Sequence, residues 1–135
     1  MRTHEKPTVI SAKLVMRVRQ ATGLGVMDTK RFLEKVSPEY YSRFMEAIYS
    51  QTQEQYNFSE SYIGHKLLYD PIEDKLDVKP IIEKANLETE ELLRNKPRGR
   101  GFGHLFEYTK KRILREKYNV EWFTLAEMNP SVIFD

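Results

Sequence analysis

Apolar side chains recur at helical spacing in the first part of the chain. Residues 9–21 predict an amphipathic helix whose apolar face consists of Ile10, Leu14, Val15, Val18 and Ala21. The glycines at 23 and 25 predict a sharp reversal, because glycine adopts the positive φ that ends a helix. A second helix over about 26–36 then returns along the first, with Met27 and Leu33 covering it and Leu24 filling the seam. We therefore expect a helix-turn-helix hairpin at 9–36.

A third helix is expected to begin directly after the hairpin. Ser37, Pro38 and Glu39 combine an N-cap residue, a proline at the first helical position and an acid near the positive end of the dipole. The apolar positions that follow include Tyr49, and the pattern fades into the polar run at 50–55. Residues 56–80 contain many apolar side chains without a regular period, which favours a loop or a short extended segment there.

The last third of the chain predicts two more helices. Pro80 suits the first turn of a fourth helix that runs to about residue 94. Its apolar face consists of Ile82, Ala85, Thr89, Leu92 and Leu93. A glycine-rich joint at 99–103 precedes a basic fifth helix over roughly 103–118, for which Leu105 and Leu114 are candidate core residues. Thr124 and Glu127 have capping-box spacing and predict one further helical turn.

The chain length agrees with a small single domain. Its 135 residues, of which 40% are hydrophobic, suffice for one compact core. We expect a mainly α fold of about five helices over 1–135, in which the hairpin is followed by a helical remainder at 37–135. A minor strand pair near 56–69 or 132–134 is left open.

The net charge of +2 is unevenly distributed. Residues 1–36 carry eight Lys and Arg against three Asp and Glu, whereas residues 37–94 carry six against twelve. Residues 95–119 again carry eight against two, and the remaining sixteen residues contribute three acids and no Lys or Arg. Either the basic blocks contact a polyanion, or they pack against the acidic middle and neutralise it.

Composition excludes several kinds of chemistry. Without cysteine there is no disulfide, thiolate metal site or cysteine nucleophile. No apolar run reaches the roughly 18 to 20 residues of a membrane span, and the first residues have no signal-peptide character. We therefore expect a cytoplasmic protein that does not enter the membrane.

One short segment resembles a known family. Residues 10–34 contain the run Ala21-Thr22-Gly23-Leu24-Gly25-Val26-Met27-Asp28-Thr29-Lys30. This run resembles the amino-terminal helical module of elongation factor Ts, which is of the ubiquitin-associated (UBA-like) type. Arg19, Thr22, Gly23, Gly25, Met27, Asp28, Lys30 and Leu33 occupy the matching positions, and Val18 replaces the usual leucine. The same window is similar, less closely, to the carboxy-terminal domain of the ribosomal stalk protein.

Both resemblances imply contact with translational GTPases. The binding residues they suggest are Arg19, Thr22, Gly23, Leu24, Gly25, Met27, Asp28 and Lys30. Nothing after residue 36 resembles the rest of elongation factor Ts, so nucleotide exchange is not implied. The alternative is that residues 22–30 simply encode a stable hairpin, in which Thr22 and Asp28 bond backbone groups at the helix ends and Met27 fills the seam.

The basic segment at 98–117 is a candidate nucleic-acid site. Its phosphate-binding candidates are Arg98, Arg100, Lys110, Lys111, Arg112 and Arg115. Glycines let a backbone approach, and Phe102, Phe106 or Tyr108 can stack on bases. The alternative is a hinge followed by a basic helix that docks on the acidic middle.

Catalytic and metal-binding patterns are weak. His4, His65 and His104 are far apart in sequence, so they form no ligand or triad spacing. Asp70, Glu73 and Asp74 lack the alternation of a calcium loop, and we expect a solvated acidic turn there. We therefore expect a protein-binding module without metal or cofactor, leave enzymatic activity undecided, and keep self-association through 56–69 open.

Overall fold

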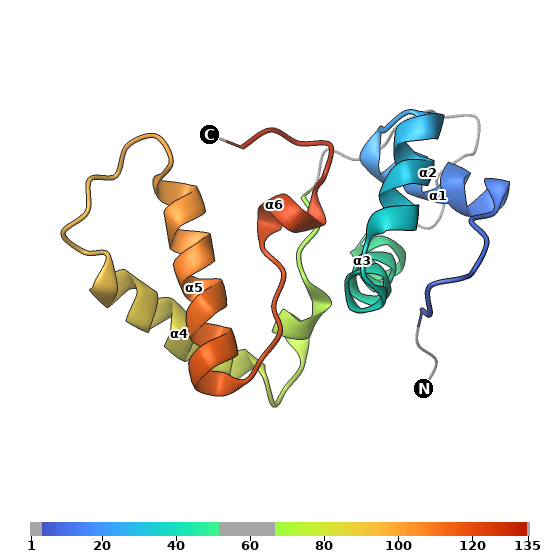
Figure 1. Ribbon diagram of the computed structural model, residues 1–135. Coiled ribbons are helices and arrows are strands. Elements are labelled where there is room, and N and C mark those ends of the chain that lie inside the picture. The colour runs from blue at the N-terminus through green and yellow to red at the C-terminus, as the bar shows by residue number, and fades with distance from the viewer. Residues whose placement is uncertain (1–3, 52–66, 135) are drawn as a thin grey trace. The chain divides into compact units, whose positions relative to one another are not determined.

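The computed structural model describes residues 4–51 and 67–134, and these residues are helical or irregular, without a strand (Figure 1). The helices in order are α1 (Ala12–Thr22), α2 (Val26–Lys35), α3 (Pro38–Gln51), the 3-10 helix η1 (Pro71–Asp74), α4 (Lys79–Leu92), α5 (Phe102–Tyr118) and α6 (Leu125–Met128). The mainly α fold class is confirmed. No strand forms at 132–134, and the predicted segment at 56–66 lies outside the described residues.

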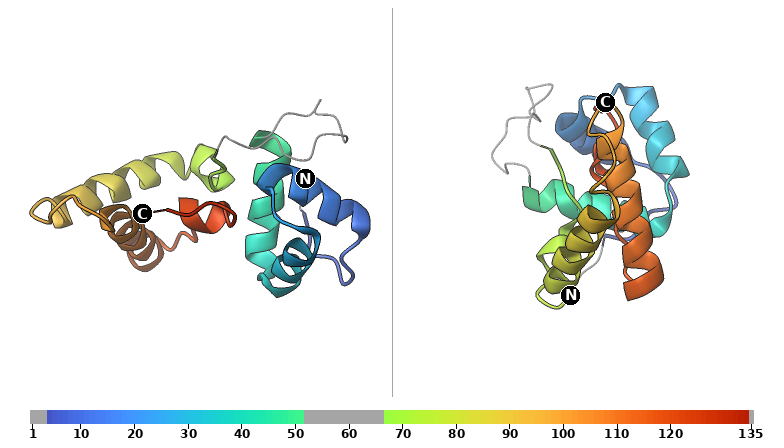
Figure 2. Two further views of the ribbon diagram at one scale, coloured as in Figure 1. Left: turned by 90° about the horizontal axis from the view of Figure 1, so that it is seen from above. Right: turned by 90° about the vertical axis from the view of Figure 1, so that its left-hand side faces the viewer.

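Contacts along the chain define two compact units. Unit 1 comprises residues 1–68 with 129–132, and unit 2 comprises residues 69–128 with 133–135. That residues 1–135 form a single domain stays a prediction. Figure 2 shows the helices of each unit from two further directions.

Unit 1 begins with the predicted hairpin. The Ser11 hydroxyl accepts a hydrogen bond from the Leu14 N–H at 3.1 Å, so α1 starts three residues later than the apolar pattern suggested. Helix α2 packs against α1, as expected. Ser37 caps α3 by accepting from the Tyr40 N–H at 3.1 Å, and Pro38 is its first residue, so both start signals are confirmed.

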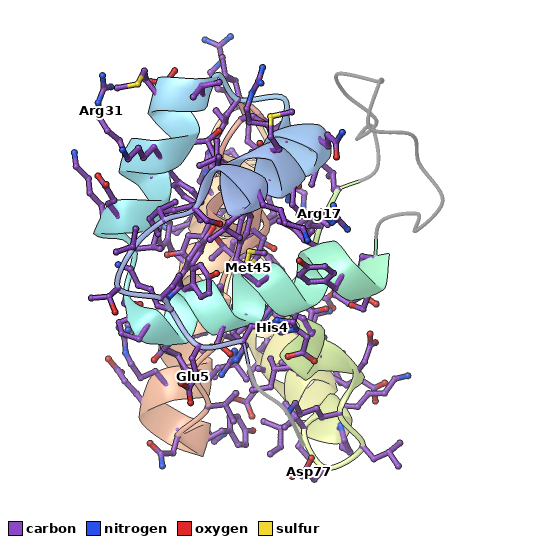
Figure 3. All side chains as sticks on the ribbon, turned by 90° about the vertical axis from the view of Figure 1, so that its right-hand side faces the viewer. His4, Glu5, Arg17, Arg31, Met45 and Asp77 are labelled. Atoms are coloured by element: carbon purple, nitrogen blue, oxygen red, sulfur yellow. The ribbon has the colours of Figure 1, made fainter. Side chains whose placement is uncertain are left out.

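Aromatic rings join α2 to α3. The Phe32 ring lies edge-on to Tyr40 and to Phe44, with centroids 5.8 and 5.3 Å apart. Phe44 and Met45 are buried in this unit, and Figure 3 labels Met45. Tyr49, expected on the apolar face of α3, is instead 47% exposed, with the Arg17 guanidinium 4.9 Å from its ring. The edge-to-face pairs that Phe32 makes with Tyr40 and Phe44 each add about 0.5 to 1.5 kcal/mol beyond the apolar area they bury.

A side-chain amide closes unit 1 across a long stretch of sequence. Asn129 accepts from the Leu68 N–H through Oδ1 and donates through Nδ2 to the Leu68 carbonyl, both at 2.8 Å. Both residues are buried, so the two bonds satisfy backbone groups that water does not reach.

Unit 2 is built on the packing of α4 against α5. Its core contains Ile82, Ala85, Leu114 and Trp122, which are all buried. Two predicted core residues are wrong, because Leu92 is 61% exposed and Leu105 is 42% exposed. The core face of α4 passes instead through Ile82, Ala85 and Thr89.

The predicted capping box at the start of α6 is confirmed. Thr124 donates its N–H to Glu127 Oε1 at 2.8 Å, and Glu127 donates its N–H to Thr124 Oγ1 at 3.2 Å. No helix in residues 4–51 or 67–134 has the length and apolar character needed to cross a bilayer.

Candidate functional site

The turn between α1 and α2 depends on one left-handed residue. Gly23 has φ +80° and ψ 3°, and its N–H donates to the Arg19 carbonyl at 2.7 Å. This is a C-cap geometry that residues with a Cβ adopt only with strain. Gly25 has an ordinary φ of −71° and serves as the N-cap of α2 without a side-chain bond. Of the two glycines, only Gly23 is required by its backbone angles.

Two side chains hold the turn from the α1 side. The Thr22 hydroxyl donates to the Val18 carbonyl at 2.9 Å and accepts from the Leu24 N–H at 3.2 Å. Arg19 donates through Nε to the Leu24 carbonyl at 3.0 Å. Both backbone groups of Leu24 are therefore bonded to side chains of α1, and the turn has a defined conformation.

The expected role of Asp28 in capping is wrong. Its carboxylate lies 3.4 Å from Arg31 in an exposed pair one turn along α2. Exposed pairs of this kind contribute roughly 0 to 1 kcal/mol, so Asp28 affects the surface charge more than the fold.

Met27 does not fill the seam between the helices. Its side chain is 60% exposed, and the neighbouring Val26 is 50% exposed. The buried face of α2 passes through Thr29 and Leu33, which are four residues apart. Met27 is two residues before Thr29, about 200° around the helix, so it faces away from α1.

The turn thus carries an exposed apolar surface. We name it the hairpin surface and define it by Met16, Leu24, Val26 and Met27, of which Leu24 is half-buried. Lys30 is exposed on the following turn of α2. Met16 and Val26 were missed in the sequence, where only the family pattern and the glycines drew attention to this segment.

The basic segment of unit 2 divides into exposed and internally bonded cations. Arg100, Arg112 and Arg115 are exposed, and so is Arg98, whose guanidinium lies 4.6 Å from the Phe102 ring. Lys110 is only 9% exposed, and its Nζ lies 4.7 Å from the centre of the Trp122 ring.

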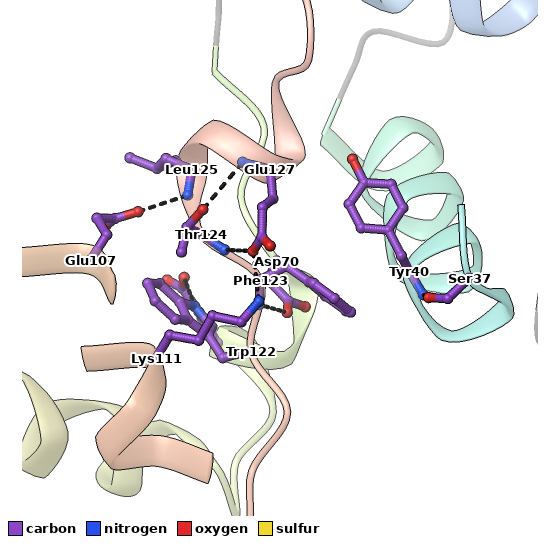
Figure 4. A network of polar contacts seen from close by, with 11 residues as sticks. Ser37, Tyr40, Asp70, Glu107, Lys111, Trp122, Phe123, Thr124, Leu125 and Glu127 are labelled. Atoms are coloured by element: carbon purple, nitrogen blue, oxygen red, sulfur yellow. Dashed lines mark hydrogen bonds and ion pairs between the residues drawn. The ribbon is translucent and has the colours of Figure 1, made fainter. Parts of the chain in front are cut away.

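Lys111 and Lys117 also have partners within unit 2. Lys111 pairs with Glu127 at 2.8 Å, as Figure 4 shows, and lies 4.8 Å from the Phe123 ring. Lys117 pairs with Glu88 of α4 at 2.8 Å, which lowers the pKa of Glu88, first by this hydrogen bond and then by that from Tyr118. At Lys117 the basic helix does contact the acidic middle of the chain.

The carboxylates at 70–74 do not converge on one point. Asp70 is fully buried and accepts from the N–H groups of Ile72 at 3.0 Å and Phe123 at 2.9 Å. Glu73 accepts from the indole N–H of Trp122, and Asp74 from the Tyr69 hydroxyl. The expectation of a solvated turn is wrong for Asp70, because its role is to bond backbone groups that are far apart in the chain.

Burial shifts the pKa of Glu73 upward. Desolvation is the main cause, and Trp122 and Lys110 oppose it. Figure 4 shows the indole of Trp122 beside this group of polar contacts. The Glu73 carboxyl nevertheless accepts a hydrogen bond from the neutral Trp122 indole at 2.7 Å, at the edge of the core. We therefore assign Glu73 a structural role.

The histidines that the structure describes have separate surroundings. The His104 ring bonds the Phe134 carbonyl through Nε2 at 3.1 Å, and the His4 ring stacks on Tyr49. His65 lies outside the described residues. Across residues 4–51 and 67–134, no three His, Asp or Glu side chains form a group that could hold a metal ion.

Comparison with protein-family models, with curated proteins and with solved structures gave no match for this chain.

Proposed function

We propose that the protein is a protein-binding module and that the turn at 22–30 is its interface. The observation that carries this proposal is the exposure of Val26 and Met27 beside a turn whose conformation is held by Gly23, Thr22 and Arg19. Because the backbone of this turn is already ordered, little backbone entropy is lost when a partner covers these side chains.

The residues of the interface have different roles in this proposal. Leu24 and Met27 supply apolar contact, Lys30 and Arg19 supply positive charge, and Asp28 modulates that charge. Gly23, Gly25 and Thr22 set the path of the backbone. Arg19 has a second role, because its Nε holds the Leu24 carbonyl.

A translational GTPase is the partner that we propose to test first, and the cytoplasm is the compartment in which such contact would occur. Support comes from the resemblance of residues 10–34 to elongation factor Ts, in which Gly23, Met27 and Lys30 occupy pattern positions. The backbone of Gly23 agrees with that pattern, since its positive φ accounts for a glycine there.

Calorimetric titration of the 135-residue chain into purified elongation factor Tu, in its GDP and GTP forms, tests both the interface and the partner. Met27→Lys should weaken binding at least about tenfold, since a new charge must be desolvated in an apolar contact. Leu87→Lys on α4 is the matched control, because Leu87 is 65% exposed and belongs to unit 2. Equal affinity of Met27→Lys and the unchanged protein would remove the hairpin as the interface, whereas no binding by any form would remove only this partner.

Nucleic-acid binding through the basic segment is the second candidate function. It is favoured by the exposure of Arg98, Arg100, Arg112 and Arg115. Lys110 and Lys111 contribute less to it, because their ammonium groups contact Trp122 and Glu127.

Fluorescence anisotropy with labelled single-stranded RNA and duplex DNA, at about 50 and about 200 mM salt, separates the two candidates. Replacing Arg112 and Arg115 by Gln should reduce affinity and the salt slope if the basic segment binds phosphates. Replacing Lys13 and Lys30 of unit 1 by Gln removes the same charge and serves as the control. No binding at the lower salt concentration would exclude this candidate.

A further inference from the structure

Unit 2 contains a cavity of about 310 Å³, partly open to solvent, between the first turns of α5 and the short helix α6. Its apolar wall consists of Phe102, Phe106, Tyr108, Leu125, Ala126 and Phe134. Small-molecule sites begin at roughly 300 Å³, and an apolar cavity of about half this volume is known to hold benzene. The cavity is therefore large enough for a single aromatic ring with a short substituent.

The polar side chains on the wall are already bonded to the protein. Glu107 accepts from the Leu125 N–H at 2.8 Å, and the His104 ring bonds the Phe134 carbonyl at 3.1 Å. Thr124 Oγ1 accepts from the Glu127 N–H at 3.2 Å within the capping box. These bonds fix the backbone of α6 and of residue 134 around the cavity.

This bonding pattern limits the chemistry of an occupant. An anionic ligand would lie beside the Glu107 carboxylate and would find no lysine or arginine on the wall to pair with, which costs free energy. Tyr108 is the remaining side chain on the wall with a polar group, and its hydroxyl can donate or accept a hydrogen bond. Aromatic rings of the wall offer stacked or edge contacts to another ring.

We infer that this cavity binds a small aromatic molecule without a negative charge, of the size of a benzene ring with one short substituent such as a hydroxymethyl group. The occupant packs against Phe102, Phe106 and Phe134, and Tyr108 is available for one hydrogen bond. The site lies wholly within unit 2, so it is independent of the hairpin surface and of the function proposed for it.

Nuclear magnetic resonance titration of the 135-residue chain with benzyl alcohol tests the inference. Saturable shifts should appear in the backbone amides of 102–108 and 124–126. Benzoate, which shares the ring and carries a negative charge, should bind at least about tenfold more weakly. Equal affinity for benzoate, shifts centred elsewhere or a lack of saturation would each overturn the proposal.

Two variants connect the binding to the cavity. Ala126→Leu adds three carbon atoms to the wall and should weaken benzyl alcohol binding at least about tenfold, and Ala126→Val should have an intermediate effect. Leu87→Ala, a truncation at an exposed position of α4, should leave binding unchanged. Thermal melts of each variant confirm folding. A folded Ala126→Leu protein that binds with unchanged affinity would show that the cavity is not the site.

Discussion

Trp122 donates its indole N–H to Oε2 of Glu73 at 2.7 Å, so the single tryptophan of the chain is bonded to a carboxyl whose pKa is raised by burial. Lys110 lowers this pKa, and Asp70 and Glu107 raise it further. The indole therefore reports on a partly buried titrating group that can be followed by fluorescence.

This relationship predicts a pH-dependent contribution to stability. A carboxyl with a higher pKa in the folded than in the unfolded protein binds its proton more tightly when folded. Its contribution is complete below the ordinary value of 4.5 and is lost as the pH rises through the raised value. Glu73→Gln should therefore stabilise the protein at about pH 7.5, and this gain should shrink at about pH 4. Urea unfolding, monitored by circular dichroism, measures the free energy of unfolding of both proteins at each pH. A gain that does not vary with pH would contradict the raised pKa of Glu73.

The two glycines of the turn should respond differently to substitution. Gly23→Val forces a branched side chain into φ +80° and should lower the free energy of unfolding by about 1 to 3 kcal/mol. Gly25→Ser is the matched control, because φ is −71°, no atom lies within 4 Å of an added Cβ, and serine is a good N-cap. It should change stability by only a few tenths of a kcal/mol. Similar losses for both variants would show that the left-handed backbone is not the cause.

Asp70 is predicted to be the most sensitive carboxylate in unit 2. Asp70→Ala leaves the N–H groups of Ile72 and Phe123 without their acceptors inside the protein, and should cost about 3 to 5 kcal/mol. Asp74→Asn alters an exposed carboxylate of the same segment and should cost less than about 1 kcal/mol. Thermal melts of the two variants compare them, and near-equal melting temperatures would refute the role given to Asp70.

A buried threonine should be replaceable with a gain in stability. Thr29 is 0% exposed, and its hydroxyl has no hydrogen-bond partner among the described residues. Thr29→Val removes this unsatisfied group at nearly constant volume and should stabilise by about 1 kcal/mol. Thr89 is equally buried but donates to the Ala85 carbonyl at 2.7 Å, so Thr89→Val should destabilise by about 1 kcal/mol. Chemical unfolding should therefore give opposite signs for the two changes.

Local signals in the sequence were sufficient for most helix boundaries. Ser37 and the pair Thr124 and Glu127 act within three residues along the chain, so their capping bonds follow from spacing alone. The hairpin at 9–36 was predictable for the same reason, because its glycines and the period of its apolar residues are also local features of the sequence.

Side-chain surroundings set by distant residues were not predictable. Asp70 bonds the N–H of Phe123, which is 53 positions later, and no local pattern indicates such a partner. Met27 was misplaced because the sequence shows that α2 is amphipathic but not which of its apolar residues faces α1. Leu92 and Leu105 were misplaced in the same way. The cavity beside α6 combines residues from three segments of unit 2, and the sequence offered no sign of it.

The two hydrogen bonds between Asn129 and Leu68 restrict how unit 1 can be prepared without unit 2. The chain passes between them after residues 68, 128 and 132, so neither unit is a continuous fragment. A fragment that stops at residue 68 would lack Asn129 and leave both backbone groups of Leu68 without their partners. Unit 1 therefore needs residues from both sides of 69–128, and a fragment that keeps it whole would carry 129–132 joined to residue 68 by a linker.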